Sequence, residues 1–209
     1  MAPKPVIVFL IKVIVLMAAL MIGWHFGLGR AYHTMLAGFI DVTYPPIDPT
    51  GVVNGALVRE GDFLLRLGMG QNFFTLNINI NDIAGSNTLV LIALFLATPV
   101  RGHWNELSAH LSLSLLALFL IHTATVITVS QEAFMSHPQI MESNPFSSWQ
   151  VKLVPRYNVF YEELGMYLFA LLLWFPYVMR RVREDADAAQ SPDDMPKRKP
   201  TQWVGSRKR

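Results

Sequence analysis

Near its start the chain carries an apolar stretch that reads VIVFLIKVIVLMAALMIGWHFGL over residues 6–28. The stretch has one charged side chain, Lys12, close enough to its first residue for the stem to reach the lipid headgroups. A helix needs about 20 apolar residues to cross the hydrocarbon core of a bilayer. Residues 6–28 are therefore predicted to form a transmembrane helix.

An export signal peptide is the alternative for this stretch, because Lys4 precedes the apolar residues. The stretch is longer than the apolar part of a signal peptide, and no small-residue cleavage site follows it. We therefore expect an uncleaved anchor that initiates insertion.

Three further apolar runs follow, at residues 83–100, 107–129 and 160–178. Across the chain 52% of the residues are hydrophobic and 15% are charged, a balance that is unusual for a soluble domain. Backbone groups inside lipid must bond within their own segment, so these runs are expected to be helices. The sequence thus predicts an α-helical integral membrane protein with a four-helix transmembrane bundle.

Basic residues near the helix ends fall on one side of such a bundle, and cytoplasmic ends are the ones enriched in them. These residues are Lys4, Lys12, Arg101, Arg180, Arg181 and Arg183. We expect a multi-pass protein of the bacterial cytoplasmic (inner) membrane with both termini in the cytoplasm. The segments 29–82 and 130–159 would then be extracytoplasmic loops.

The first of these loops has the pattern of β-strands. Leu76, Ile78 and Ile80 alternate with asparagines, so a strand here has one apolar and one polar face. A turn at Glu60-Gly61 is predicted to join two earlier strands. We expect a small extracytoplasmic antiparallel sheet whose last strand leads into the helix that begins at residue 83.

The last segment, residues 179–209, is expected to be a disordered basic cytoplasmic tail. It holds an acidic patch and then two basic clusters, KRK at 197–199 and RKR at 207–209. The clusters favour a topology signal over a lipid or protein site. The formal net charge of +2 comes largely from this tail, so we expect contact with membrane lipid and no nucleic-acid partner.

Three segments together resemble a known family. They read VREGDFLLRL at 58–67, FTLNINI at 74–80 and NDIAGSNTL at 81–89. Exosortases and archaeosortases carry an extended V-x-R-x-G segment that leads to a strand and then to A-C-S-G at the mouth of a helix. Gly61 and Gly85 match this pattern, with Arg59 offset by one residue. The resemblance continues more faintly through the later helices.

The resemblance implies a membrane transpeptidase fold whose catalytic positions have been exchanged. The family's cysteine falls at Ile83, its arginine at Thr125 and its histidine at Tyr161. Isoleucine is no nucleophile, threonine carries no positive charge and tyrosine is no base near neutral pH. The chain contains no cysteine at all. It is therefore similar to the noncatalytic membrane proteins associated with exosortase H, and Ile83, Thr125 and Tyr161 mark vestigial active-site positions.

Other polar residues allow other chemistry. His25, His110 and His122 could take part in b-type haem ligation, but His110 and His122 lie about 18 Å apart along one helix and cannot share a haem. Glu162 and Glu163 could bind a cation or, more simply, complement the helix dipole. His122, Glu162 and Glu163 form a candidate polar cluster, and we expect no cofactor or metal.

We therefore expect a noncatalytic accessory protein that binds an exosortase or its sorting-signal substrate. The alternative is a small structural or assembly subunit of an energy-converting membrane complex. An enzyme that uses Glu162, Glu163 and the histidines with a metal ranks third.

Overall fold

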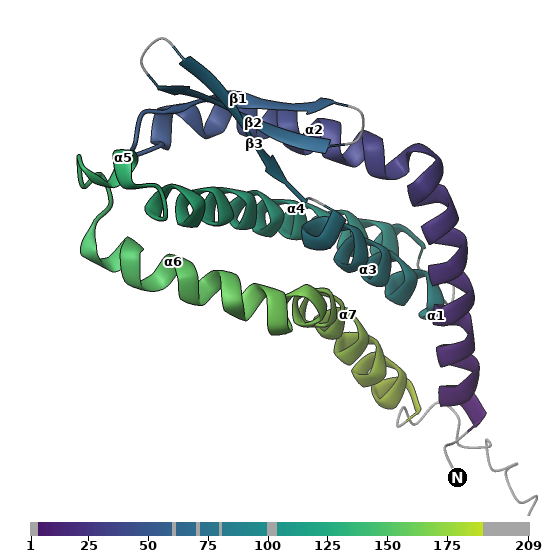
Figure 1. Ribbon diagram of the computed structural model, residues 1–209. Coiled ribbons are helices and arrows are strands. Elements are labelled where there is room, and N and C mark those ends of the chain that lie inside the picture. The colour runs from purple at the N-terminus through teal and green to yellow at the C-terminus, as the bar shows by residue number, and fades with distance from the viewer. Residues whose placement is uncertain (1–3, 60–61, 70–71, 80, 100–103, 190–209) are drawn as a thin grey trace, which may run out of the picture.

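The computed structural model describes residues 4–59, 62–69, 72–79, 81–99 and 104–189, which are mainly helical (Figure 1). The helices are α1 (Lys4–Gly23), α2 (Gly29–Thr43), α3 (Ser86–Ala97), α4 (Trp104–Met135), α5 (Pro138–Met141), α6 (Ser148–Phe160) and α7 (Met166–Ala189). The strands are β1 (Val53–Arg59), β2 (Asp62–Met69) and β3 (Asn72–Ile78). Single π-helical turns lie at Asn81–Gly85 and Tyr161–Gly165, a 3-10 turn lies at Pro45–Ile47, and a kink at Trp24–Leu28 joins α1 to α2.

Three helical stretches of the described chain are long and apolar enough to cross a membrane. They are Val6–Thr43, Trp104–Met135 and Ser148–Glu184. These are the lengths and compositions of a membrane protein. The helix expected at residues 83–100 is shorter than predicted, because the apolar helical stretch that contains α3 runs from Ile83 to Ala97 and rises about 22 Å, whereas the hydrocarbon core is about 30 Å thick. The count of four crossings therefore stays a prediction.

The first helix does not end in a loop at residue 28, as the sequence pattern indicated. A sharp bend at Gly27, whose φ is 146°, turns the chain from α1 into α2 (Figure 1). Helix α2 buries one face, formed by His33, Leu36, Ala37 and Ile40. The segment predicted as an extracytoplasmic loop with β-strands, residues 29–82, therefore begins with an amphipathic helix that packs beside β1.

The small antiparallel sheet is confirmed. Its strands run in the order β1-β2-β3, and Arg59 pairs with Asp62 at the end of the β1–β2 ladder. The alternation in β3 holds, since Ile78 is buried while Asn77 and Asn79 are exposed. The predicted turn at Glu60-Gly61 and the third apolar position, Ile80, lie outside the described residues. The extracytoplasmic position of the sheet stays a prediction.

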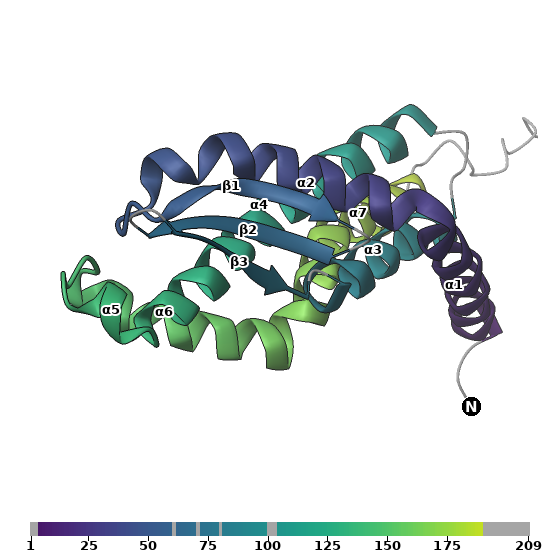
Figure 2. The ribbon, with the colours of Figure 1, turned by 45° about the horizontal axis from the view of Figure 1, so that its top comes forward.

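The elements form three layers in Figure 1. The sheet and α2 lie at the top, α4 and α3 in the middle, and α6 and α7 at the bottom, while α1 stands across the edge of the layers. Seen from above, in Figure 2, the sheet covers part of α4 and is flanked by α2. The strand face with Phe63 and Leu65, which are both fully buried, belongs to the same core as α2 and α4.

Four helices meet at one end of this arrangement. Phe9 of α1 stacks on Trp174 of α7 with ring centroids 5.8 Å apart. The Trp174 indole donates a hydrogen bond of 3.0 Å to the Thr98 hydroxyl, just after α3. Arg181 of α7 forms an ion pair of 2.6 Å with Glu106 in the first turn of α4. The start of α1, the end of α3, the start of α4 and the later part of α7 are thus tied together.

The segment predicted as the second extracytoplasmic loop, residues 130–159, is largely helical. Helix α4 continues to Met135, and α5 and α6 occupy much of the rest. Ser147 and Gln150 form a capping box that starts α6, in which the Ser147 amide donates to the Gln150 side chain at 2.9 Å. Residues 179–189, which were expected to belong to a disordered tail, are helical, because α7 extends to Ala189. Residues 190–209, with both basic clusters, lie outside the described chain.

Candidate functional site

The structure brings Tyr161 and Ile83 together in the interior of the molecule. Tyr161 begins the π-helical turn before α7, and its side chain is 1% exposed. Its hydroxyl donates a hydrogen bond of 2.6 Å to the Ile83 carbonyl oxygen and accepts one of 2.9 Å from the Asn87 amide. The hydroxyl is therefore fully engaged by the first turns of the segment that leads into α3.

Thr125 of α4 lies beside the same tyrosine. Its hydroxyl is 2.9 Å from that of Tyr157, on α6, and is also close to that of Tyr161. The three residues that the resemblance singled out, Ile83, Thr125 and Tyr161, thus gather where α3, α4 and α7 approach one another. Their hydrogen bonds run to carbonyl, amide and hydroxyl groups, so the arrangement packs and positions helices.

His122 lies one turn before Thr125 and is fully buried. Its Nδ1 atom is 2.6 Å from the hydroxyl of Tyr32, on α2, and Thr88 of α3 lies close to the same hydroxyl. Within the described chain the protein supplies no partner to Nε2 of His122 or to Oδ1 of Asn87, although both atoms are buried. These two atoms are the unsatisfied positions of an otherwise bonded polar cluster.

The fold does not join His122, Glu162 and Glu163 in the predicted polar cluster. Both glutamates are exposed at the start of α7, whereas His122 is 0% exposed. Among the described residues no hydrogen bond joins either carboxylate to the imidazole. No group of three or more potential metal ligands occurs in the described chain. A buried imidazole and two exposed carboxylates serve different surroundings. The predicted dipole role of the glutamates was also wrong, because Ser148–Glu184 is one continuous helical stretch and neither glutamate lies at its N-terminus.

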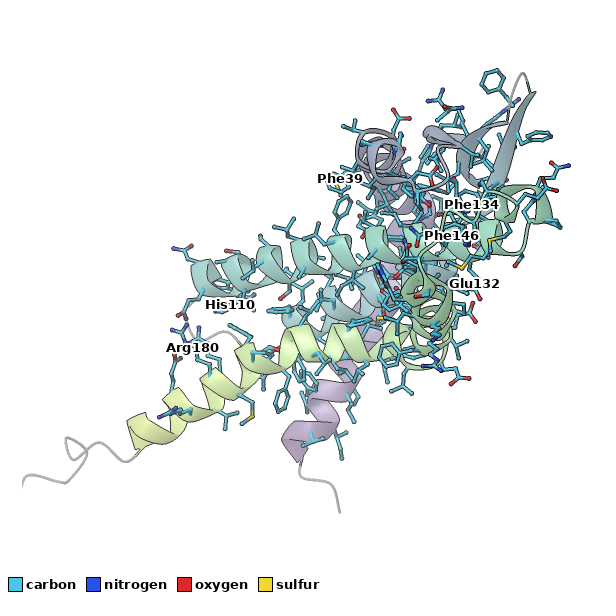
Figure 3. All side chains as sticks on the ribbon, turned by 90° about the vertical axis from the view of Figure 1, so that its left-hand side faces the viewer. Phe39, His110, Glu132, Phe134, Phe146 and Arg180 are labelled. Atoms are coloured by element: carbon cyan, nitrogen blue, oxygen red, sulfur yellow. The ribbon has the colours of Figure 1, made fainter. Side chains whose placement is uncertain are left out.

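The other two histidines considered for haem ligation, His25 and His110, differ from His122 in burial and lie elsewhere in the fold. His25 is exposed and its ring contacts Phe26, while His110 packs on Tyr177 near Arg180 at the far end of α4 (Figure 3). A further buried histidine, His33 of α2, was missed by sequence reasoning. Its ring meets Trp24 edge-on at 5.8 Å. The signal was its place on the apolar face of α2.

Polar contacts continue beyond the cluster along α4. Thr128 donates a hydrogen bond of 2.7 Å to the Asn158 side chain, which in turn donates to Glu132. The Ser130 hydroxyl donates to that of Tyr44 at 3.2 Å. Figure 3 shows Glu132 at this end of α4, close to Phe134 and Phe146. Hydroxyl groups on α4 therefore join it to α2 and α6, as its serine and threonine content suggested.

An apolar groove lies on the other side of Tyr32. Its walls come from the junction of α1 and α2, from α3 and from α4, and its volume is about 840 Å³. Figure 3 shows Phe39 of α2 directed toward α4, where its ring meets that of Phe119 with centroids 5.4 Å apart. Tyr32 and Thr88 line the groove and also belong to the polar cluster. These two side chains connect the buried cluster with a space at the molecular surface.

Comparisons of this chain with protein-family models, with curated proteins and with solved structures find no match.

Proposed function

We propose that this chain is a membrane protein that acts by binding, as an accessory of an exosortase-type protein sorting system. Its partner would be the exosortase or the membrane-embedded sorting signal of its substrate. The observation that carries the proposal is the convergence of Ile83, Thr125 and Tyr161. A fold shared with exosortases requires these three positions to lie close together. A resemblance that reflected only hydrophobic composition would not require this.

The chemistry at these positions supports binding over catalysis. A nucleophile needs a base within hydrogen-bond reach and a donor for the developing charge. Here the Tyr161 hydroxyl is held by Asn87 and by a main-chain carbonyl, and the position that would carry the nucleophile is an isoleucine. The same contacts lock the start of α3 to the start of α7, which gives a partner a fixed surface.

The orientation inferred from the basic residues supports the same partner. With both termini inside, the segment around Tyr161 would lie in the outer part of the bundle, where a sorting signal would be presented. Phe160 and Leu164 are exposed on either side of Tyr161, with 41% and 53% of their surface accessible. An apolar partner helix fits such side chains at a membrane-facing position.

The test is site-specific photocrosslinking in membranes that contain a catalytically inactive exosortase. A photoreactive residue replaces Leu164, and the matched control carries it at Ile14, an exposed side chain on α1. The proposal expects a crosslink to the exosortase, or to a substrate with its sorting signal, from Leu164 and not from Ile14. Equal crosslinking from both positions contradicts it. Crosslinks only to subunits of an energy-converting complex would favour the assembly-subunit alternative.

A further inference from the structure

The apolar groove beside Tyr32 has the size and form of a ligand site. A volume of about 840 Å³ lies within the range of about 300–1,000 Å³ that small-molecule sites occupy. The bend at Gly27 creates one wall, because it carries α2 away from the axis of α1. Trp24 and Leu28 come from that bend, Ile92 comes from α3, and Leu116 comes from α4.

The lining of the groove favours an uncharged ligand. Among the described residues that line it none is charged, and Tyr32 and Thr88 are its hydrogen-bonding side chains apart from the Trp24 indole. A charged group placed here would lose its hydration without gaining a counter-charge, which is costly. An apolar chain with an uncharged polar end matches the lining along its whole length.

The polar end of the groove is held in place from behind. The Tyr32 hydroxyl lies 2.6 Å from Nδ1 of His122, so one of the two groups donates to the other. In either tautomer Nε2 of His122 needs a partner, and the protein supplies none in the described chain. Asn87, next to Thr88, also has an unpartnered buried oxygen. Neither His122 nor Asn87 lines the groove. A groove ligand meets the hydroxyl of Tyr32, which is bonded to His122, and that of Thr88, which donates to the Ala84 carbonyl oxygen at 2.8 Å. Each hydroxyl oxygen has two lone pairs and can accept a hydrogen bond from a ligand.

The outer rim of the groove is apolar and exposed. Leu28 and Leu116 are more than half exposed, and both belong to stretches long and apolar enough to cross a membrane. Next to membrane-crossing helices the most abundant ligands are lipids, and lipid chains match the apolar lining of the groove. We propose that the groove binds one chain of an uncharged bilayer lipid, whose hydroxyl or ester group hydrogen-bonds at Tyr32 and Thr88.

The first test uses the full-length protein in detergent and monoolein with a photoreactive group in its chain. Leu116→Trp fills the groove, and Leu113→Trp places the same ring on the same helix at a 65% exposed leucine that does not line it. The proposal expects Leu116→Trp to reduce labelling several-fold, while Leu113→Trp stays at the wild-type level. Labelled peptides should come from α2, α3 and α4. Equal labelling of the two variants overturns the proposal.

The second test concerns the polar end. Wild-type protein should prefer photoreactive monoolein over a hydrocarbon of the same chain length and photoreactive group. Tyr32→Phe should reduce that preference by about twofold to tenfold, the value of one neutral hydrogen bond. Thr88→Val provides an independent variant if Tyr32→Phe fails to fold, because Thr88 contributes to the same end. An unchanged preference in both folded variants overturns the polar contact.

A partner helix is the competing occupant of the groove. It would give crosslinks from a photoreactive residue at Leu116 to another protein in native membranes, with monoolein labelling unaffected by Leu116→Trp. That result would overturn the lipid assignment without bearing on the proposed function, which is tested at Leu164.

Discussion

The hydroxyl of Tyr161 donates a hydrogen bond of 2.6 Å to the carbonyl oxygen of Ile83, 78 residues earlier in the chain. The same hydroxyl accepts from Asn87, which is fully buried. One phenol group thus joins the turn before α7 to the turn before α3. In an apolar interior the loss of this contact is costly, because it leaves buried polar groups without hydrogen-bond partners.

Tyr161→Phe removes that hydroxyl and keeps the ring. The Ile83 carbonyl loses a donor and the Asn87 amide loses an acceptor, so the free energy of unfolding should fall by about 1–3 kcal/mol. Unfolding in mixed detergent micelles measures the change. Tyr167→Phe is the matched control, because Tyr167 is 57% exposed on α7 and should tolerate the same deletion. Equal stabilities of the two variants would contradict a structural role for the Tyr161 hydroxyl.

The bend between α1 and α2 depends on Gly27. Its φ of 146° is a value that side-chain-bearing residues rarely adopt, so Gly27→Ala should cost about 1–3 kcal/mol of stability or straighten the junction. Gly38→Ala is the control of opposite sign. A Cβ there meets nothing within 4 Å, and alanine in a helix gains about 0.5–1 kcal/mol over glycine. Thermal unfolding of the two variants checks both signs, and a tolerated Gly27→Ala would argue against the bend.

Much of the fold was readable from local patterns. Most of each apolar run lies in a helix, and the alternation at Leu76 and Ile78 lies in a strand. Helices and strands each place apolar residues at their own period, so both patterns can be recognised in the sequence. Helix α2 was missed although its signal was present. Its buried residues are His33, Leu36, Ala37 and Ile40, which recur at the spacing of one helical face. The sequence signal for the start of α6 was also present, because Ser147 and Gln150 have the spacing of a capping box.

The candidate site was less readable, because its contacts are long-range. Tyr32 and His122 are 90 residues apart, and neither residue type indicates the other. The groove exists because the bend at Gly27 leaves space between α2 and α4, which no local pattern describes. Glu162 and Glu163 were predicted to join a polar site because they are adjacent carboxylates, but both side chains are exposed on the helix.

The start of the sheet depends on Asp48. Its carboxylate accepts main-chain N–H bonds from Thr50, Val52 and Val53 at 3.1, 2.9 and 2.9 Å. Asp48→Ala should reduce the free energy of unfolding by about 1.5–3 kcal/mol, the value of hydrogen bonds to a charged group. Hydrogen exchange should show faster exchange at the first residues of β1. Glu163→Ala, at an exposed carboxylate, is the control and should leave both measurements unchanged.

The absence of cysteine from the sequence makes the number of membrane crossings directly measurable. Single cysteines are placed at Ile47, Asn105, Glu142 and Arg183, each of which is exposed. Four crossings with both termini inside predict that cysteines at Ile47 and Glu142 react with an impermeant maleimide in intact cells. Cysteines at Asn105 and Arg183 should react only after the membrane is permeabilised.

Helix α3 is the element that decides this count. It is short for a crossing. Thr98, just after its end, bonds to Trp174 of α7, which stacks on Phe9 near the start of α1. Ile83, just before its start, bonds to Tyr161, which precedes α7. The segment therefore covers the same distance along the bundle as the first part of α7, which favours a crossing in which neighbouring helices shield its ends. If α3 does not cross, Asn105 and Arg183 become reactive in intact cells and Glu142 becomes protected. That pattern would reduce the bundle to three crossings and put the two termini on opposite sides of the membrane.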